Sequence, residues 1–302
     1  MLGAIIGDMV GSTYEFHPIK TKVFDIYSMR SRMTDDSYLT LDVARTLMSN
    51  YPIKYDDSSL DKIKKELVSN FINSWKKYPG AGFGGRFYDW CLEVSKGAEP
   101  VPYNSYGNGS AMRISPVAWV ASNEDELKLL SKTVTEVTHN HPEGIKGAEA
   151  VALCIYMALH GSKKEEIEQR MIEDYYPEIA TFDYDDLVKN YRFSEICQKS
   201  VPQAIYCFLI SHSLEDCVRN CVAIGGDCDT TGAMAGAIAE AYYNKDKLSH
   251  FEERFLYMMI DPEVEKLIKD FHEIHWRSKN TKRNCKGKSK WENTDAKTRY
   301  GL

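Results

Sequence analysis

Hydrophobic residues recur along most of the chain at intervals of three and four, the spacing of one face of an α-helix. The two clearest stripes are Leu60, Ile63, Leu67, Phe71 and Trp75, followed by Leu127, Leu130, Val134 and Val137. Typical helix-start residues accompany the pattern at Ser59, at Pro142, and at Ser213 with Asp216 three positions later. Sustained strand alternation is hard to find. The sequence therefore predicts a single compact all-α domain of about ten helices.

The first predicted helix carries glycine at every fourth position, Gly3, Gly7 and Gly11. Each glycine costs about 1 kcal/mol relative to alanine inside a helix. A stripe of glycines is therefore expected only where a second backbone comes very close, so this helix should be central. The same spacing occurs in membrane dimers, but this segment is too short for that role and carries Asp8.

Two long stretches, residues 95–109 and 175–200, lack helical periodicity, and long loops in compact domains often carry function. No linker divides the body of the chain, so we predict one domain over residues 1–276. Residues 277–302 are rich in lysine and arginine and have no apolar stripe. We predict that they form a basic, poorly ordered tail.

Composition is that of a globular protein: 302 residues, of which 43% are hydrophobic and 27% are charged. The net charge is −6, and the tail's own charge of +7 leaves −13 on the rest of the chain. Eight cysteines include no C-x-x-C pair, which indicates buried thiols in a reducing compartment. No apolar stretch reaches the roughly 18 residues of a membrane span. A cytoplasmic location without a membrane partner is expected.

Two short acidic clusters stand out, and each lies where a helix is predicted to begin. They are Thr34-Asp35-Asp36 and Asp227-Cys228-Asp229-Thr230. Helix capping is the simplest interpretation of either cluster alone. Together they offer four carboxylates and two hydroxyls, which are the hard oxygen ligands that Mg²⁺ or Mn²⁺ prefers in a two-metal site. Cys228 is expected to point away from the aspartates into the core.

A glycine-rich turn, Gly107-Asn108-Gly109-Ser110, precedes Ala111-Met112-Arg113 and is a candidate phosphate cradle. Such turns are weak evidence alone, because many only reverse the chain. His139 and His141 form a His-x-His pair, for which we favour hydrogen bonds to loop carbonyls over metal ligation. No spacing rule singles out Glu15.

At these residues the sequence resembles the ADP-ribosylglycohydrolase family, which includes dinitrogenase reductase-activating glycohydrolase and the ADP-ribosyl-acceptor hydrolases. The resemblance spans Met1 to about Ile274 and stops before the tail. It rests on five motifs in the family's order: Gly3 to Asp8 with Tyr14-Glu15, Thr34-Asp35-Asp36, Gly107 to Arg113, Thr138 to Pro142, and Gly225 to Thr230.

The resemblance implies an all-α hydrolase that uses two Mg²⁺ ions, for which Mn²⁺ can substitute, and releases ADP-ribose from an acceptor. The implied metal ligands are Thr34, Asp35, Asp36, Asp227, Asp229 and Thr230. Glu15 matches the family's glutamate near the metals, and Glu15, Asp36 and Asp227 are the candidate proton carriers. The implied ADP-ribose contacts are Gly107, Asn108, Gly109, Ser110, Met112 and His139.

Two other functions stay open at this point. A non-catalytic ADP-ribose-binding module would keep the cleft without a competent base, and a dinuclear-metal nucleotide phosphohydrolase would use the same oxygen ligands to attack phosphorus. The acceptor, which could be arginine, serine, a small guanidine or a nucleic-acid base, is not indicated. For the tail we favour a solvated extension over a nucleic-acid-binding arm, although Trp291 and Tyr300 could stack on bases.

Overall fold

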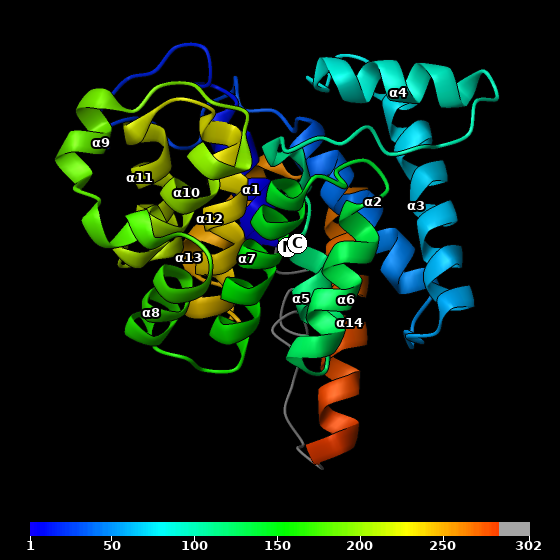
Figure 1. The fold of residues 1–302 in the computed structure, drawn as a ribbon. Coiled ribbons are helices and arrows are strands. Elements are labelled where there is room, and N and C mark those ends of the chain that lie inside the picture. The colour runs from blue at the N-terminus through cyan, green and yellow to red at the C-terminus, as the bar shows by residue number, and fades with distance from the viewer. Residues whose placement is uncertain (284–302) are drawn as a thin grey trace, which may run out of the picture.

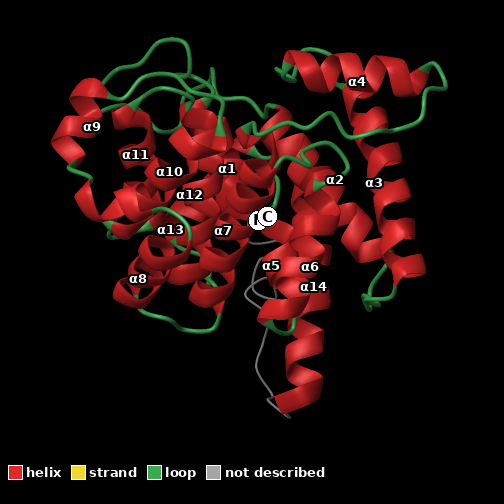
Figure 2. Ribbon diagram, viewed as in Figure 1, coloured by secondary structure: helices red, strands yellow, loops and turns green. Residues whose placement is uncertain are grey.

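The structure is a computed structural model of the 302-residue chain, and it describes residues 1–283. Its described part is all-α, as predicted, with helices and loops and only one isolated β-bridge, between Gly107 and Ile196 (Figure 2). The helices are α1 (Leu2–Gly11), α2 (Asp35–Ser49), α3 (Asp57–Lys77), α4 (Gly85–Ser95), α5 (Ser115–Val120), α6 (Glu124–Thr135), α7 (Pro142–Leu159), α8 (Lys164–Asp174), α9 (Tyr184–Asn190), α10 (Val201–Leu209), α11 (Leu214–Ile224), α12 (Cys228–Tyr243), α13 (His250–Met259) and α14 (Pro262–Arg283).

Helix α1 lies at the centre of the molecule and is buried along its whole length (Figure 1). Its glycine stripe packs against a small-residue stripe on α12, which confirms the predicted close approach of a second backbone. A Cβ added to Gly7 would lie 1.9 Å from the carbonyl oxygen of Gly232, and one added to Gly3 would lie 2.1 Å from that of Gly236. The two backbones are therefore in direct contact, and only glycine fits between them.

The remaining helices pack around this central pair. Helices α7, α10 and α11 contact α12, while α2 packs against α1, α3, α5 and α14 (Figure 1). Helices α3 and α4 lie at one edge of the molecule. This arrangement places the N-terminal ends of α2 and α12 beside the C-terminal end of α1, and these ends carry the two acidic clusters.

Several local predictions are confirmed and others need correction. Pro142 opens α7, and the Ser213 side chain caps α11 by accepting from the Asp216 amide. Helix α3 starts earlier than predicted, because Asp56 rather than Ser59 is its cap. The stretch 175–200 is not one loop: it contains α9 and two short 3₁₀ turns, Pro177–Thr181 and Cys197–Lys199. The described part holds fourteen α-helices rather than about ten.

Helix α14 runs to Arg283 and so continues past residue 276, where we placed the start of the tail. Residues 284–302, most of the predicted tail, lie outside the described residues, and the domain boundary remains a prediction. The seven cysteines within the described part are free and buried. None of the described helices is both long and apolar enough to cross a membrane.

Candidate active site

Both predicted acidic clusters open into one cleft of about 520 Å³. Its walls come from the α1–α2 loop, the segment before α4, the glycine-rich turn and the segment before α10. The lining includes Glu15, Thr34, Asp35, Asp36, Gly107, Asn108, Gly109, Met112, His139, Asp227, Asp229 and Thr230. Of the six implied metal ligands and six implied ADP-ribose contacts, eleven therefore line this cleft, and only Ser110 does not. Glu15 lines the same cleft.

Each acidic cluster is a helix N-terminus. Thr34 caps α2, and its side chain accepts from the Asp36 amide. Asp227 precedes α12 and follows Gly225 and Gly226, whose φ angles of 70° and 73° favour glycine. The two ends meet directly, because the Thr230 hydroxyl donates to Asp36 Oδ2 at 3.2 Å. The helix ends therefore bring the clusters into contact across a sequence separation of 194 residues.

Asp8, on the central helix α1, completes this arrangement, and the sequence analysis did not select it. Its carboxylate accepts from the Thr34 amide at 2.9 Å, the Thr34 hydroxyl at 2.6 Å, and the amide and hydroxyl of Ser37. One carboxylate oxygen from each of Asp8, Asp36 and Asp229 lies within 4.8 Å of the others. One sequence feature could have indicated Asp8, because it is the single acid in an otherwise apolar helix. A buried charge needs a specific partner.

A second group of three carboxylates, Glu15, Asp227 and Asp229, meets the same distance limit. Asp35 lines the cleft beside these groups, although it belongs to neither of them. Its backbone amide donates to the Ala81 carbonyl at 2.9 Å, which fixes the start of α2 against the segment before α4. Asp229 is shared by both groups and is therefore the central carboxylate of the site.

Burial disfavours charge on all of these acids, and repulsion from neighbouring carboxylates adds to it at every one except Asp8. Burial, and then the neighbouring carboxylates Asp229 and Asp8, raise the pKa of Asp35 and Asp36 well above the usual range. Burial raises the pKa of Asp8 to about 6 and that of Asp227 to about 6. For Glu15, burial and the charge of Asp229 raise the pKa to about 8.

The chemistry of these residues fits a bound divalent cation. Asp36 Oδ1 is buried and has no hydrogen-bond partner among the described residues, which is costly unless something else satisfies it. The surrounding donors are carboxylate and hydroxyl oxygens, the set that suits Mg²⁺ or Mn²⁺. Cys228 does not compete for this role, because its thiol points to the Gly11 carbonyl at 3.3 Å, as predicted.

The glycine-rich turn is joined directly to the acidic site. Asn108 Nδ2 donates to Asp227 Oδ2 at 2.6 Å, and the Asn108 amide donates to the Glu195 carbonyl at 2.8 Å. Gly107, Gly109 and Met112 line the cleft. Ser110 lies behind the turn instead, where its hydroxyl donates to the carbonyls of Gly107 and Gly144. In this structure Ser110 shapes the turn from inside.

The two histidines of the His-x-His pair have separate positions. His139 borders the turn: its Nδ1 lies 2.7 Å from the Thr138 hydroxyl, and a Cβ on Gly109 would lie 3.4 Å from its Nε2. Burial, with the charges of Arg113 and Arg86, lowers the pKa of His139 well below the usual range, so the ring is neutral. His141 caps α7 by accepting from the Glu143 amide. Their expected partners were loop carbonyls, and that expectation was wrong.

Several cleft residues carried no spacing signal in the sequence and are defined only by the fold. Arg86 stacks on Tyr103, with its guanidinium carbon 5.1 Å from the ring centroid. Phe16, which directly follows Glu15 in the sequence, stacks on Phe193. The other lining residues that are not among the predicted site residues are Arg32, Leu39, Ala81, Gly82, Gly84, Gly85, Phe87, Ser105, Tyr106, Arg113, Glu195 and Ile196.

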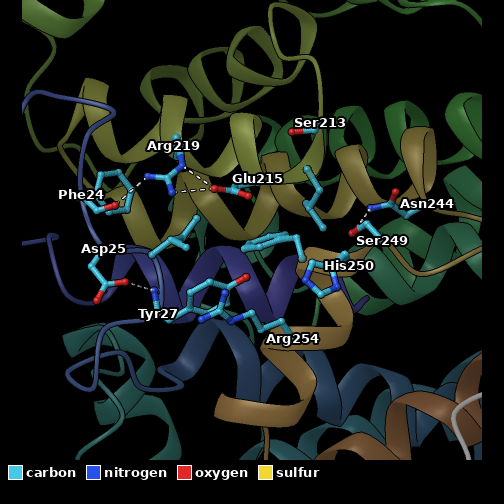
Figure 3. Close-up of a pocket in the computed structure, with 13 residues that line it drawn as sticks. Phe24, Asp25, Tyr27, Ser213, Glu215, Arg219, Asn244, Ser249, His250 and Arg254 are labelled. Carbon is cyan, nitrogen blue, oxygen red and sulfur yellow. Dashed lines mark hydrogen bonds and ion pairs between the residues drawn. The ribbon is translucent and has the colours of Figure 1, made fainter.

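A second cavity, of about 580 Å³, lies between residues 24–27, the start of α11 and the start of α13 (Figure 3). It contains none of the predicted site residues. Arg219 dominates it, pairing with Glu215 at 2.7 Å and donating to the Phe24 carbonyl at 3.0 Å. None of its lining residues has a buried side-chain oxygen without a hydrogen-bond partner, so it offers nothing comparable to Asp36.

A glycine-rich turn joined to a buried cluster of oxygen ligands, on an all-α scaffold, is the combination that the sequence resemblance implied. A model of the ADP-ribosylglycohydrolase family matches residues 1–278, and the chain belongs to this family. It is therefore an enzyme of the class that hydrolyses glycosidic bonds.

Curated relatives agree with this assignment at low identity. The chain is 26% identical to the human (Homo sapiens) ADP-ribosylhydrolase ARH3, over 82% of this chain and 85% of that protein. It is 22% identical to the ADP-ribosyl-[dinitrogen reductase] glycohydrolase of Rhodospirillum rubrum, over 88% of this chain and 92% of that protein. It is 24% identical to the ADP-ribosylarginine hydrolase Tri1 of Pseudomonas putida, over 80% of this chain and 69% of that protein.

The fold is also found among solved structures. A chain described as an ADP-ribosylglycohydrolase-related protein complex aligns with a TM-score of 0.68 and 21% identity. The alignment covers 91% of the present chain and 97% of the other. This similarity supports the fold.

Proposed function

We propose that this enzyme hydrolyses the glycosidic bond between ADP-ribose and an acceptor group, using two Mg²⁺ ions or Mn²⁺ in their place. One observation carries the proposal: the N-terminal ends of α2 and α12 bring their acidic clusters together, around a buried Asp36 oxygen that has no hydrogen-bond partner among the described residues. The glycine-rich turn lies directly beside them through the Asn108–Asp227 hydrogen bond.

The ions would be held by the two clusters from opposite sides. Thr34, Asp35 and Asp36 would contribute from α2, and Asp227, Asp229 and Thr230 from α12. Asp8 would act behind them, because it accepts a hydrogen bond from the Thr34 hydroxyl and so leaves a lone pair of that oxygen for a cation. When bound, the ions would orient the ribose hydroxyls and lower the pKa of a bound water.

Glu15 is the best-placed residue for moving a proton. It is half-buried, lines the cleft and lies beside Asp229, and its raised pKa of about 8 lets it hold or release a proton near neutral pH. Attack at an anomeric carbon needs a carboxylate to take the proton of the incoming water. Asp36 and Asp227 are the alternative bases, although a metal ligand is a weaker base than a free carboxylate.

The glycine-rich turn would hold the diphosphate, because bare backbone amides can approach an anion closely. Gly107, Asn108, Gly109 and Met112 face the cleft and would contact ADP-ribose. His139, neutral and pointing its Nε2 toward Gly109, would border the same group. Ser110 would contribute by holding the turn in shape.

Product analysis tests the proposal. Purified protein is incubated with peptides that carry ADP-ribose on serine or on arginine, with Mg²⁺, with Mn²⁺, and after chelation. We expect free ADP-ribose and unmodified peptide, loss of turnover on chelation and recovery on adding Mg²⁺. AMP with ribose phosphate on the peptide would instead indicate a phosphohydrolase.

Glu15→Gln separates a catalyst from a binding module. We expect the variant to lose about 10²–10⁴-fold in turnover while its affinity for ADP-ribose, measured by calorimetry, stays within a few-fold of the wild type. Tight ADP-ribose binding by a wild-type protein that releases nothing from any substrate would contradict the proposed hydrolysis.

A further inference from the structure

Arg113, at the end of the glycine-rich motif, is a buried cation in the inner wall of the cleft. It is the largest of the fully buried side chains in the described part of the chain. Its guanidinium carbon lies 4.5 Å from the centroid of the Phe71 ring. Burial lowers the pKa of Arg113 to about 10, so the group is still charged at neutral pH. Burying a charge is costly, which indicates a specific task for this side chain.

Only one of the three guanidinium nitrogens of Arg113 has a hydrogen-bond partner among the described residues. Nη2 donates to the Thr138 hydroxyl oxygen at 2.6 Å, whereas Nε and Nη1 are buried without a partner. The charges of Asp35 and Asp42 favour the cation, but neither carboxylate lies within ion-pair distance of it. The contact with Thr138 is therefore the directional interaction of this side chain.

The Thr138 hydroxyl connects Arg113 to His139. A guanidinium can only donate, so the hydroxyl oxygen accepts from it and the single hydroxyl proton is available to His139 Nδ1, 2.7 Å away. The Tyr103 hydroxyl also interacts with Thr138 and can donate to the second lone pair of the same oxygen. The charge of Arg113 makes the Thr138 hydroxyl a better donor, because hydrogen bonds in a chain polarise one another.

The other ring nitrogen of His139 faces the glycine-rich turn. A Cβ added to Gly107 or Gly109 would lie 3.6 Å or 3.4 Å from Nε2, so this nitrogen borders the space that the two glycines leave open. No described residue forms a hydrogen bond with Nε2, although His139 lines the cleft. The ring is neutral, and a neutral ring that accepts at Nδ1 carries its proton on Nε2.

We propose that Arg113 and Thr138 are positioning residues that hold His139 in the Nε2–H tautomer, so that a neutral N–H donor faces an anionic oxygen bound at the glycine-rich turn. The inference rests on the proposed function, which places the diphosphate of ADP-ribose there. The opposite tautomer would direct a lone pair at the same oxygen and repel it. Arg113 thus affects ligand binding through Thr138 and His139.

The tautomer can be observed without a substrate, by nitrogen NMR of protein labelled in its histidine rings, and the signal absent from His139→Gln identifies His139. We expect Nε2–H in wild type and in Thr138→Ser, which keeps the hydroxyl. Thr138→Val keeps the shape without the hydroxyl and should show a mixture of both tautomers. Thr133→Val removes a hydroxyl of α6 that donates to the Leu129 carbonyl at 2.8 Å, so it is the matched control and should leave the tautomer unchanged.

Calorimetry with free ADP-ribose measures the consequence for binding. Thr138→Val should bind about tenfold more weakly than wild type, because a hydrogen bond to a charged group is weakened. On a hydrolysed substrate KM should rise while kcat stays within about threefold, as expected when binding energy remote from the reacting bond is lost. Thr138→Ser and Thr133→Val should match wild type. Arg113→Met should show the tautomer mixture and the weaker binding of Thr138→Val.

Three outcomes would overturn the inference: an Nδ1–H ring in wild type, an unmixed Nε2–H ring in Thr138→Val, or equal ADP-ribose affinity of Thr138→Val and wild type. If Arg113→Met does not fold, the Thr138 variants decide, because they break or keep the same chain of hydrogen bonds with Arg113 in place. A wild type that shows the expected ring and the expected affinities but releases nothing from any ADP-ribosylated peptide would contradict the proposed hydrolysis and leave the positioning role intact.

Discussion

At the scale of single residues, the candidate site is a set of acids that would be unfavourable without a partner. Asp36 illustrates this point, because burial and four neighbouring aspartates, with Asp229 and Asp8 foremost, oppose its charge. A cation would reverse the sign of that interaction, turning repulsion among ligands into attraction to the metal. Replacing one ligand by a neutral side chain should therefore raise the stability of the metal-free protein and lower its activity.

Asp36→Asn should separate these two effects. In metal-free protein the variant should melt a few degrees higher than wild type, since one opposed carboxylate is removed. In saturating Mg²⁺ the order should reverse, because ligand binding stabilises wild type more. Turnover should fall by at least about 10². Thermal melts with and without Mg²⁺ check the first part; a variant that is less stable in both conditions would show that Asp36 is structural rather than a ligand.

Asp42 gives a pH-dependent prediction that does not involve the metal site. Burial raises its pKa to about 7, although Ser74 and Arg45 oppose the shift. Its pKa in the folded state thus lies above that of an unfolded aspartate, about 3.9. The folded protein binds the extra proton between these values, so this residue's contribution to stability is lost as pH rises from about 4 to 7.

Asp42→Asn should remove that loss. The stability of the variant relative to wild type, measured by urea unfolding, should increase between pH 5 and pH 8 by on the order of 2 kcal/mol. The ion pair with Arg45, which is 45% exposed, is too weak to reverse this sign. Asp61→Asn, at an exposed position, serves as control and should show no pH-dependent difference. A constant difference across the pH range would refute the assignment.

At the scale of elements, the site depends on how closely α1 and α12 approach. Asp8 lies on α1 and Asp229 on α12, and the glycine contacts between these helices set the distance between the two carboxylates. Gly11 is the contact nearest the site, because a Cβ there would lie 2.3 Å from the Asp229 Cα. The packing of these two helices therefore also determines the geometry of the proposed metal ligands.

Gly7→Ala tests this coupling. Alanine gains about 1 kcal/mol in helix propensity, but its Cβ would meet the Gly232 backbone at 1.9 Å, and overpacking against backbone should cost more than about 3 kcal/mol. We expect lower solubility or a much lower melting temperature, with loss of activity in any folded fraction. Gly80→Ala, where nothing lies within 4 Å of the added Cβ, should stay within about 0.5 kcal/mol of wild type. Equal stability of the two variants would contradict the close packing.

The sequence predicted the close packing of α1 well, without identifying α12 as its partner, and the loops poorly. Regular glycine spacing has one physical explanation, backbone contact, so the central position of α1 followed directly. Phe16, Phe193 and Glu195 follow no period, and only folding brings residues 16 and 193 together. Asp8 was missed for another reason: within a helical pattern it looks like an interruption, and its importance comes from the Thr34 and Ser37 groups that converge on it.

At the scale of the whole molecule, the described fold accounts for the cleft without the C-terminal segment. Every residue that lines the cleft lies at or before Thr230. Helix α14 contributes to packing instead: Ile268 and Phe271 are buried, and the helix contacts α2 and α5. A truncation that tests the tail must therefore spare α14 through Arg283.

Removing residues 284–302 should leave kcat/KM on a small ADP-ribosylated substrate within about twofold of wild type, because the proposed site and the described core are intact. Our favoured interpretation of the basic segment is a solvated extension, and then the truncated protein should also match wild type on large substrates. If the segment instead binds nucleic acid, wild type should retain an oligonucleotide at low salt, lose it steeply as salt rises, and lose it on truncation. Loss of small-substrate activity in a truncated protein that still melts cooperatively would place these residues in the active site, and the boundary drawn at residue 276 would then be wrong.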